Sequence, residues 1–321
     1  DHGRRYARLG DFKTSKMLAY HMREIGLKQF KYDRSPSYFQ RLEMPVNYFP
    51  GEIKLNIDGV ELEAGRDFLP MPTSGSTKRK LYIGAHFLQP SELDKGEFKK
   101  LSKDDMDKKA LIIDRTVFEG QEENEYYKKA TEKNDLGAAI IIYLESGKLV
   151  HAVSQQADDF PSLVVKKDKF PKDAKIVTVE VNNEFKEYYK ANNVVGYIQG
   201  TVKPDSFIVI GAHYDHLGMI GRDILFPGAN DNASGVAMML DLAKKFNTEG
   251  QRRRRGEEPV PDPVYSMVFV AFCGEELGLI GSDFFTFRSP YWLPKTKFMI
   301  SLDMVGAGKD GIGIVNGKSE H

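Results

Sequence analysis

Acidic residues and one histidine stand at the ends of three predicted strands and at the start of one predicted helix. Each strand is a short apolar run, and the polar residues follow directly after it. Because the carboxyl ends of parallel strands meet at one edge of a sheet, residues far apart in the sequence converge there. The residues are His213 and Asp215 after the first strand, Asp231 at the helix start, Glu275 and Glu276 after the second strand, and Asp303 at the end of the third.

A cluster of this composition predicts a metal site. Several carboxylates in one partly buried site cannot all ionise without a compensating charge, because repulsion and desolvation raise their pKa values. A divalent cation supplies that charge. One imidazole among several carboxylates suits zinc, with cobalt or manganese as substitutes. If one carboxylate bridges, the same set could hold two metal ions about 3.5–4 Å apart.

Each of these residues also has a purely structural interpretation. Asp231 could be a helix N-cap, the Glu275–Glu276 pair could be exposed surface, and His213 could be a hydrogen-bonded core histidine. All of them, however, occur at successive element ends beside glycines that permit close backbone approach. This coincidence favours the joint interpretation, in which they form one functional site.

The segments that carry these residues alternate between strand and helix from about residue 182 onward. The run 207–210 is continuously apolar, which is typical of a strand buried on both faces. Further strands are predicted at 264–272 and 298–304, and helices at 232–246 and 279–287. The pattern predicts an α/β fold with a mainly parallel sheet flanked by helices.

The composition divides the chain into three parts. Residues 1–46 form the N-terminal part of the main domain, with one amphipathic helix that ends at Gly26. Residues 47–181 contain short β-like runs between glycine, proline or charged clusters, which predicts an inserted, smaller, β-rich α+β domain. Residues 182–321 form the core that carries the acidic cluster. The runs in the insert are 53–57, 81–83, 110–113, 138–143 and 162–165, with a polar helix at 122–133.

The overall composition excludes several classes of protein. The 321 residues include 46 Lys plus Arg and 46 Asp plus Glu, so the formal charge is zero, which argues against a dedicated nucleic-acid binder. No apolar run approaches the roughly 18 residues of a membrane-spanning helix.

The lone Cys273 excludes an internal disulfide, and we expect it to be buried. The arginine-rich segment 251–263 is expected to be a solvated loop, and the oligomeric state is not predicted.

Four segments resemble the motifs of one enzyme family. Residues 211–218, 228–235, 269–281 and 301–306 resemble, in this order, motifs of zinc-dependent exopeptidases of the bacterial leucyl aminopeptidase type, peptidase family M28. The similarity covers about 182–306, and the segment 47–180 resembles the protease-associated domain that many members carry as an insert. The resemblance implies a zinc exopeptidase-like fold, two zinc ions per complete site, and export to the periplasm, cell surface or medium.

The resemblance further implies an aminopeptidase that removes N-terminal residues from peptides through a metal-activated water. Carboxypeptidase- or dipeptidase-like members share these motifs, and a non-catalytic, receptor-like peptide-binding relative is the alternative from another class. Glu275 would be the general base, and Asp215 would orient His213 through its other ring nitrogen. The metal ligands would be His213 and Asp303 for the first zinc, Glu276 for the second, and Asp231 as the bridge between them.

One ligand of the family pattern has no matching counterpart. The family supplies a second metal-binding histidine from a segment beyond at least one more strand, whereas this sequence ends at His321, soon after Asp303. That spacing is shorter than the family pattern. His216 lies within the first motif, where we interpret it as loop structure, and His86 and His151 belong to the insert. We therefore expect the sequence to lack the C-terminal part of the domain, with one strand and part of the substrate pocket.

Overall fold

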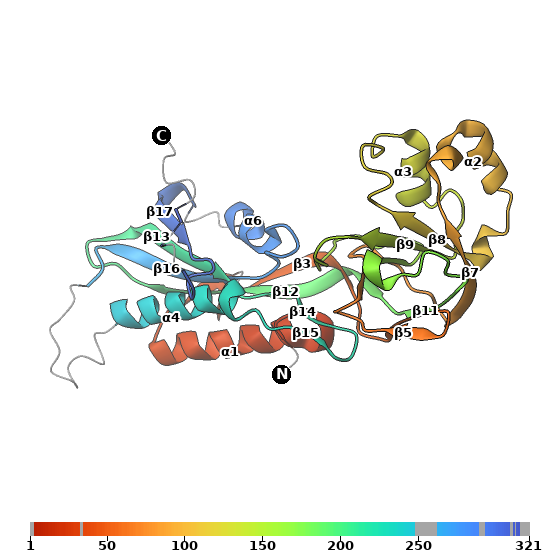
Figure 1. The fold of residues 1–321 in the computed structure, drawn as a ribbon. Helices are drawn as coiled ribbons and strands as arrows, with labels where there is room; N and C mark the ends of the chain where they lie inside the picture. Colours follow the sequence, from red (N-terminus) through yellow and green to blue (C-terminus); the bar gives the residue numbers. More distant parts are fainter. Residues whose placement is uncertain are drawn as a thin grey trace. The chain divides into compact units, whose positions relative to one another are not determined.

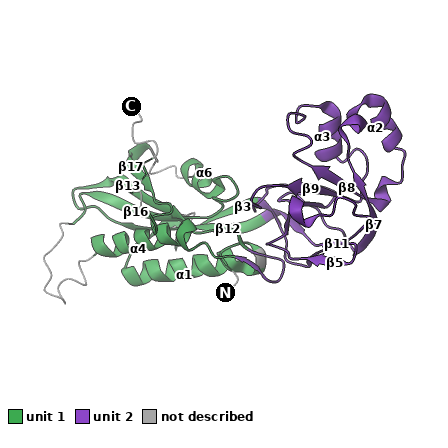
Figure 2. Cartoon of the chain, viewed as in Figure 1, with its two compact units in different colours: residues 1–44, 189–218, 226–321 green, residues 45–188, 219–225 purple. Residues whose placement is uncertain are grey.

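The structure, a computed structural model, describes residues 3–32, 35–247, 262–288, 293–308, 311 and 313–314. The chain divides into two compact units (Figure 2). The first unit comprises residues 1–44, 189–218 and 226–321, and the second comprises 45–188 and 219–225. The sequence places the boundaries at 46/47 and 181/182, and it gives no sign that 219–225 groups with the second unit.

A seven-stranded sheet forms the centre of the first unit. Its strands lie in the order β17 (Thr296–Ser301), β13 (Lys203–His213), β16 (Tyr265–Phe272), β12 (Glu184–Ile198), β1 (Lys28–Tyr32) and β2 (Ser35–Ser37), with β3 (Phe39–Tyr48) paired to β12. Strands β17, β13 and β16 are parallel, whereas β12 pairs antiparallel with β16 and β1, and β1 with β2. The predicted α/β class is confirmed, and the acidic residues follow the three parallel strands β13, β16 and β17.

Helices cover both faces of this sheet. Helices α1 (Gly10–Ile25) and α4 (Gly235–Phe246) lie side by side on one face, and α6 (Ile280–Phe287) lies on the other (Figure 1). Phe285 of α6 packs edge-on against Phe272 of β16 within an apolar cluster. Helix α4 begins at residue 235 instead of the predicted 232, because Asp231 and Asn232 have non-helical backbone angles within the turn η5 (Ala229–Ser234).

The second unit contains an eight-stranded sheet and two short helices. The parallel strands β7 to β10 form one part of the sheet, and an apolar cluster that includes Phe98 and Ala130 packs the helices. The resemblance of this unit to a protease-associated domain stays a prediction. The bounds are β4 (Ile53–Ile57), β5 (Val60–Leu62), β6 (Phe68–Pro70), β7 (Leu81–Phe87), α2 (Lys95–Leu101), β8 (Lys109–Asp114), α3 (Glu125–Thr131), β9 (Ile140–Glu145), β10 (Ser162–Lys166) and β11 (Ile176–Val181), with β14 (Gly218–Ile220) and β15 (Ile224–Phe226) as a separate pair.

None of the helices in the described ranges combines the length and the apolar character needed to cross a membrane.

Helix α1 carries a buried carboxylate, Asp11. Its Oδ1 accepts a 2.7 Å hydrogen bond from the hydroxyl of Tyr189. Burial raises the pKa of Asp11 from 3.8 to about 6, so the unfolded chain releases this proton at a lower pH than the folded chain. The stabilisation from protonated Asp11 is therefore complete below about pH 4 and is lost as the pH rises through about 6.

We expect Asp11→Asn to remove this part of the pH dependence. Asparagine keeps an oxygen for the Tyr189 hydrogen bond but does not ionise. The free energy of unfolding of the variant, relative to the wild type, should rise by up to about 3 kcal/mol between pH 4 and pH 7, which is the equivalent of about two pKa units. Urea unfolding at several pH values measures this difference, and a difference that stays constant with pH would contradict the prediction.

Candidate active site

The register of the parallel strands brings the first site residues together. In β13, His213 pairs with Phe272 of β16, and Gly211 pairs with Ser301 of β17. The main-chain amide of Leu302 donates a 2.8 Å hydrogen bond to the carbonyl of Gly211. His213 and Asp303 each stand two residues beyond the paired Gly211 and Ser301, so they reach the same edge of the sheet, as predicted.

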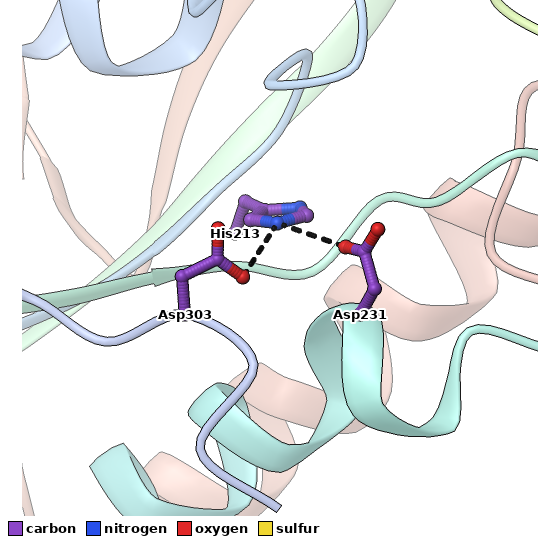
Figure 3. A group of neighbouring side chains, drawn as sticks. All are labelled: His213, Asp231 and Asp303. Carbon is purple, nitrogen blue, oxygen red and sulfur yellow. Dashed lines mark ion pairs between the residues drawn. The ribbon is translucent and has the colours of Figure 1, made fainter. Parts of the chain in front are cut away.

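His213 directs one ring nitrogen at two carboxylates. Its side chain is buried, and Nδ1 lies 3.0 Å from the main-chain carbonyl of Asp215. Because a carbonyl only accepts, Nδ1 carries the proton, and the lone pair is on Nε2. Nε2 lies 3.3 Å from Oδ1 of Asp231 and 3.5 Å from Oδ1 of Asp303 (Figure 3). Zinc bonds of about 2.0–2.1 Å in tetrahedral geometry separate ligand atoms by about 3.3–3.4 Å, so this first triad fits a zinc ion.

A second triad shares Asp231 with the first. His216 Nδ1 lies 2.8 Å from Oε1 of Glu276 and 3.7 Å from Oδ2 of Asp231. Asp231 therefore turns one oxygen toward each histidine, which is the arrangement of a bridging carboxylate. Among the described residues, these two triads are the groups whose ligand atoms lie close enough to share a cation. The interpretation of His216 as loop structure is thus incomplete, because its ring reaches the acidic cluster.

Asp215 is fully buried, next to the main chain of Glu275 and Glu276. Its carboxylate accepts hydrogen bonds from the main-chain amides of Glu275 (3.2 Å) and Glu276 (3.4 Å) and from the hydroxyl of Tyr6 (3.1 Å). Burial raises the pKa of this carboxyl. Its nearest oxygen is 3.8 Å from His213 Nδ1, so His213 donates its hydrogen bond to the main-chain carbonyl of Asp215 and not to the carboxylate. The carboxylate instead fixes the loop that carries the glutamates.

The adjacent glutamates point to different partners. Gly274 and Gly278 both have positive φ angles, 77° and 93°, and the turn between them separates the two side chains. Glu276 faces His216, whereas Oε2 of Glu275 lies 3.9 Å from His213 Nε2. Burial raises the pKa of the Glu275 carboxyl, and the nearby His213 partly opposes this shift. Glu275 is therefore a carboxylate beside the first triad that belongs to neither triad.

Arg4 is a site residue that the sequence gave no reason to single out. Its guanidinium donates to the main-chain carbonyls of Gly228 (2.6 Å), Asp231 (3.2 Å) and Tyr214 (2.8 Å). These contacts tie the loop after β13 to the loop that carries Asp231. No signal in the sequence points to this role, because it depends on where the N-terminal segment lies in the folded chain.

Two asparagines flank Asp231 and fix the loop that carries Asp303. Asn232 donates through Nδ2 to the carbonyl of Leu302 (2.8 Å), and its Oδ1 accepts from the amides of Gly235 and Met304. Asn230 Oδ1 accepts from the amide of Gly306 at 3.0 Å. In the sequence, the two asparagines beside Asp231 are the feature that could indicate such hydrogen bonds between the loops.

Cys273, the arginine-rich segment and the remaining histidines lie away from the two triads or outside the described residues. Cys273 is buried as predicted, and burial raises the pKa of its thiol well above its ordinary value, which keeps it unreactive. His321 and nearly all of the arginine-rich segment lie outside the described residues. His86 and His151 belong to the second unit.

Comparisons with known proteins agree with this geometry. Residues 193–321 match the sequence profile of Peptidase family M28. Aminopeptidase YwaD of Bacillus subtilis is 28% identical over 280 residues, which cover 84% of this chain and 55% of the relative. A probable zinc metalloprotease of Pyricularia oryzae is 40% identical over 97 residues, which cover 30% of this chain and 17% of the relative.

Solved structures share the fold. A zinc aminopeptidase from Bacillus subtilis, BSAP, matches with a TM-score of 0.61 and 22% identity over 92% of this chain and 64% of that chain. An aminopeptidase from Aneurinibacillus sp. strain AM-1 matches with a TM-score of 0.59 and 19% identity over 92% of this chain and 65% of that one. This chain thus spans no more than 55% of the two curated relatives. The resemblance inferred from the motifs is confirmed, and residues 193–321 carry the pattern of peptidase family M28.

Proposed function

We propose that this chain carries the metal site of a zinc-dependent aminopeptidase, which hydrolyses N-terminal residues from peptides. The observation that carries this proposal is the pair of triads joined by Asp231, with the carboxylate of Glu275 beside them. The names of the relatives YwaD and BSAP, an aminopeptidase and a zinc aminopeptidase, support the same activity.

The proposed cofactor is two zinc ions, the first held by His213, Asp231 and Asp303 and the second by Glu276 with Asp231 as the bridge. The first triad offers one imidazole nitrogen and two carboxylate oxygens, a donor set that suits zinc. Cobalt and manganese are proposed as substitutes, because they accept the same ligands. When bound, zinc supplies Lewis acidity, which polarises a carbonyl and lowers the pKa of a coordinated water.

The other side chains of this site transfer protons, position the glutamates and compensate charge. Glu275 lies beside the first triad without belonging to it, so its carboxylate is free to take a proton from the attacking water and deliver it to the leaving amine. Asp215 holds the main-chain amides of both glutamates and thereby fixes the direction of Glu275. The positive charge of Arg4 lies behind the loop of Asp231 and offsets part of the acidic charge.

The proposal is tested by comparing substrates that differ only at their ends. Aminoacyl p-nitroanilides with a free amine should be cleaved by the zinc-loaded protein, and their N-acetylated counterparts should not. N-blocked dipeptides with a free carboxylate test the carboxypeptidase alternative. A chelator should abolish the activity, and zinc, cobalt or manganese should restore it. If the zinc-loaded protein cleaved none of the aminoacyl p-nitroanilides with a free amine, the proposal would be contradicted.

A further inference from the structure

We propose that Tyr6 is a positioning residue of the active site, which acts on the general base Glu275 through the buried carboxylate of Asp215. This inference rests on the proposed function. Tyr6 lies 209 residues before Asp215 in the sequence, so the order of the motifs gives no indication of this role. It belongs to neither triad, so its effect on the reaction comes from the residues that it holds in place.

The first step of the argument is a hydrogen bond between two buried groups. The hydroxyl of Tyr6 donates to Oδ2 of Asp215 at 3.1 Å, and both residues are at most 2% exposed. Burial raises the pKa of the Tyr6 hydroxyl well above its ordinary value, so this group stays protonated and remains a donor. A buried acceptor that loses its donor keeps the cost of desolvation. Without the hydroxyl, the Asp215 carboxylate is therefore expected to turn toward another donor.

The second step connects Asp215 to the two glutamates. Its Oδ1 accepts from the main-chain amide of Glu275 at 3.2 Å, and its Oδ2 accepts from the amide of Glu276 at 3.4 Å. The Tyr6 hydroxyl and the Glu276 amide thus share one oxygen, so the orientation of this carboxylate decides where both amides can lie. A displacement of about 1 Å at a reacting group can cost about 10²-fold in rate. Rotation of Asp215 would therefore misdirect the carboxylate of Glu275.

The third step is that the surrounding structure holds Tyr6 in place. Its neighbour Arg5 donates through Nη1 to the main-chain carbonyl of Leu217 at 3.1 Å. Gly218 has a positive φ of 61°, and a Cβ there would overlap Arg5, so the glycine permits this close approach. The ring of Tyr6 packs edge-on against Tyr189 of β12, with ring centroids 5.2 Å apart. The hydroxyl is therefore fixed by contacts to the loop after β13 and to the sheet.

A competing explanation is that Tyr6 only stabilises the fold. Tyr6→Phe separates the two roles, because it removes the hydroxyl and keeps the ring that packs against Tyr189. Tyr38→Phe is the matched control: Tyr38 is also buried, lies in the same unit, and donates its hydroxyl to the main-chain carbonyl of Leu27 at 2.7 Å. A purely structural role predicts the same result for both variants, namely lower stability and unchanged turnover by the folded protein.

The experiment measures turnover and loop order in the zinc-loaded chain, at a temperature at which both variants are folded. At saturating zinc, Tyr6→Phe should lower kcat for an aminoacyl p-nitroanilide by about 10- to 100-fold, the usual effect of losing an outer partner, and should leave KM unchanged. Hydrogen exchange of the amides in 274–278, followed by mass spectrometry, should become about 10-fold faster, as expected for the loss of one hydrogen bond to a charged group. Tyr38→Phe should keep the wild-type kcat, KM and exchange rate.

The outcomes distinguish this inference from the proposed function. Wild-type kcat or wild-type exchange in Tyr6→Phe would overturn the role of Tyr6 and leave the aminopeptidase proposal intact. Equal losses of turnover in Tyr6→Phe and Tyr38→Phe would also overturn it, in favour of general packing. A raised KM with unchanged kcat would do the same, because the hydroxyl would then act on substrate binding. A wild type that cleaves no substrate would contradict the proposed function and, with it, the action of Tyr6 on a base.

Discussion

Asp231→Ala is expected to lose both metal ions and to reduce peptide hydrolysis to background. Asp231 is the one residue common to the two triads, and its Oδ1 and Oδ2 face His213 at 3.3 Å and His216 at 3.7 Å. Removing it leaves each triad with one imidazole and one carboxylate. The affinity at each site should fall by more than the 10- to 100-fold that loss of an outer partner costs. Metal content after dialysis measures the effect.

Asp241→Ala provides a matched control on the helix that follows. Asp241 lies on the exposed face of α4, outside both triads, and its loss should leave two ions and full activity. Circular dichroism would show whether Asp231→Ala stays folded, which we expect because Arg4 holds the main chain of this loop through the Asp231 carbonyl. If the folded Asp231→Ala variant kept either ion at wild-type affinity, the bridging role would be wrong.

Strands with a continuous or an alternating apolar pattern could be predicted from the sequence, whereas β12, with its charged first half, could not. The run 207–210 lies within β13, and the predicted strand 264–272 matches β16, because both are buried on two faces. Strand β12 begins with a mostly exposed, charged half, and its apolar run is confined to residues 194–198 at the other end. Its pairing with β16 and β1 is set by tertiary contacts, so it becomes visible only in the folded chain.

The same distinction explains what could be predicted of the site. His213 ends one parallel strand, β13, and Asp303 follows another, β17, so the rule that carboxyl ends share an edge was enough to bring them together. His216 and Arg4 do not stand at the end of a predicted strand, so this rule does not place them. Whether His216 reaches Glu276 depends on how the loop after β13 folds against the loop that carries Asp231, and Arg4 acts through main-chain carbonyls that any residue offers. Residue type and spacing therefore predict the ligands on the strand ends better than the contacts between the loops.

The second large effect is expected at Glu275. Glu275→Gln keeps the shape of the side chain but cannot accept a proton, so turnover should fall by about 10²- to 10⁴-fold, the usual contribution of a general base. Glu275 belongs to neither triad, so the variant should still bind two metal ions. Steady-state kinetics and metal analysis on the same preparation test both statements. Wild-type turnover by Glu275→Gln would remove Glu275 from the role of base.

The pH profile provides the control for this assignment. A base must be ionised to act, and burial raises the pKa of Glu275, so wild-type activity should fall as the pH drops through this raised value. Glu275→Asp keeps a carboxylate on a shorter side chain and should retain this acid limb at reduced turnover. Glu275→Gln should lose the limb, because no group with that pKa remains at this position. An unchanged acid limb in the glutamine variant would assign that ionisation to another residue of the site.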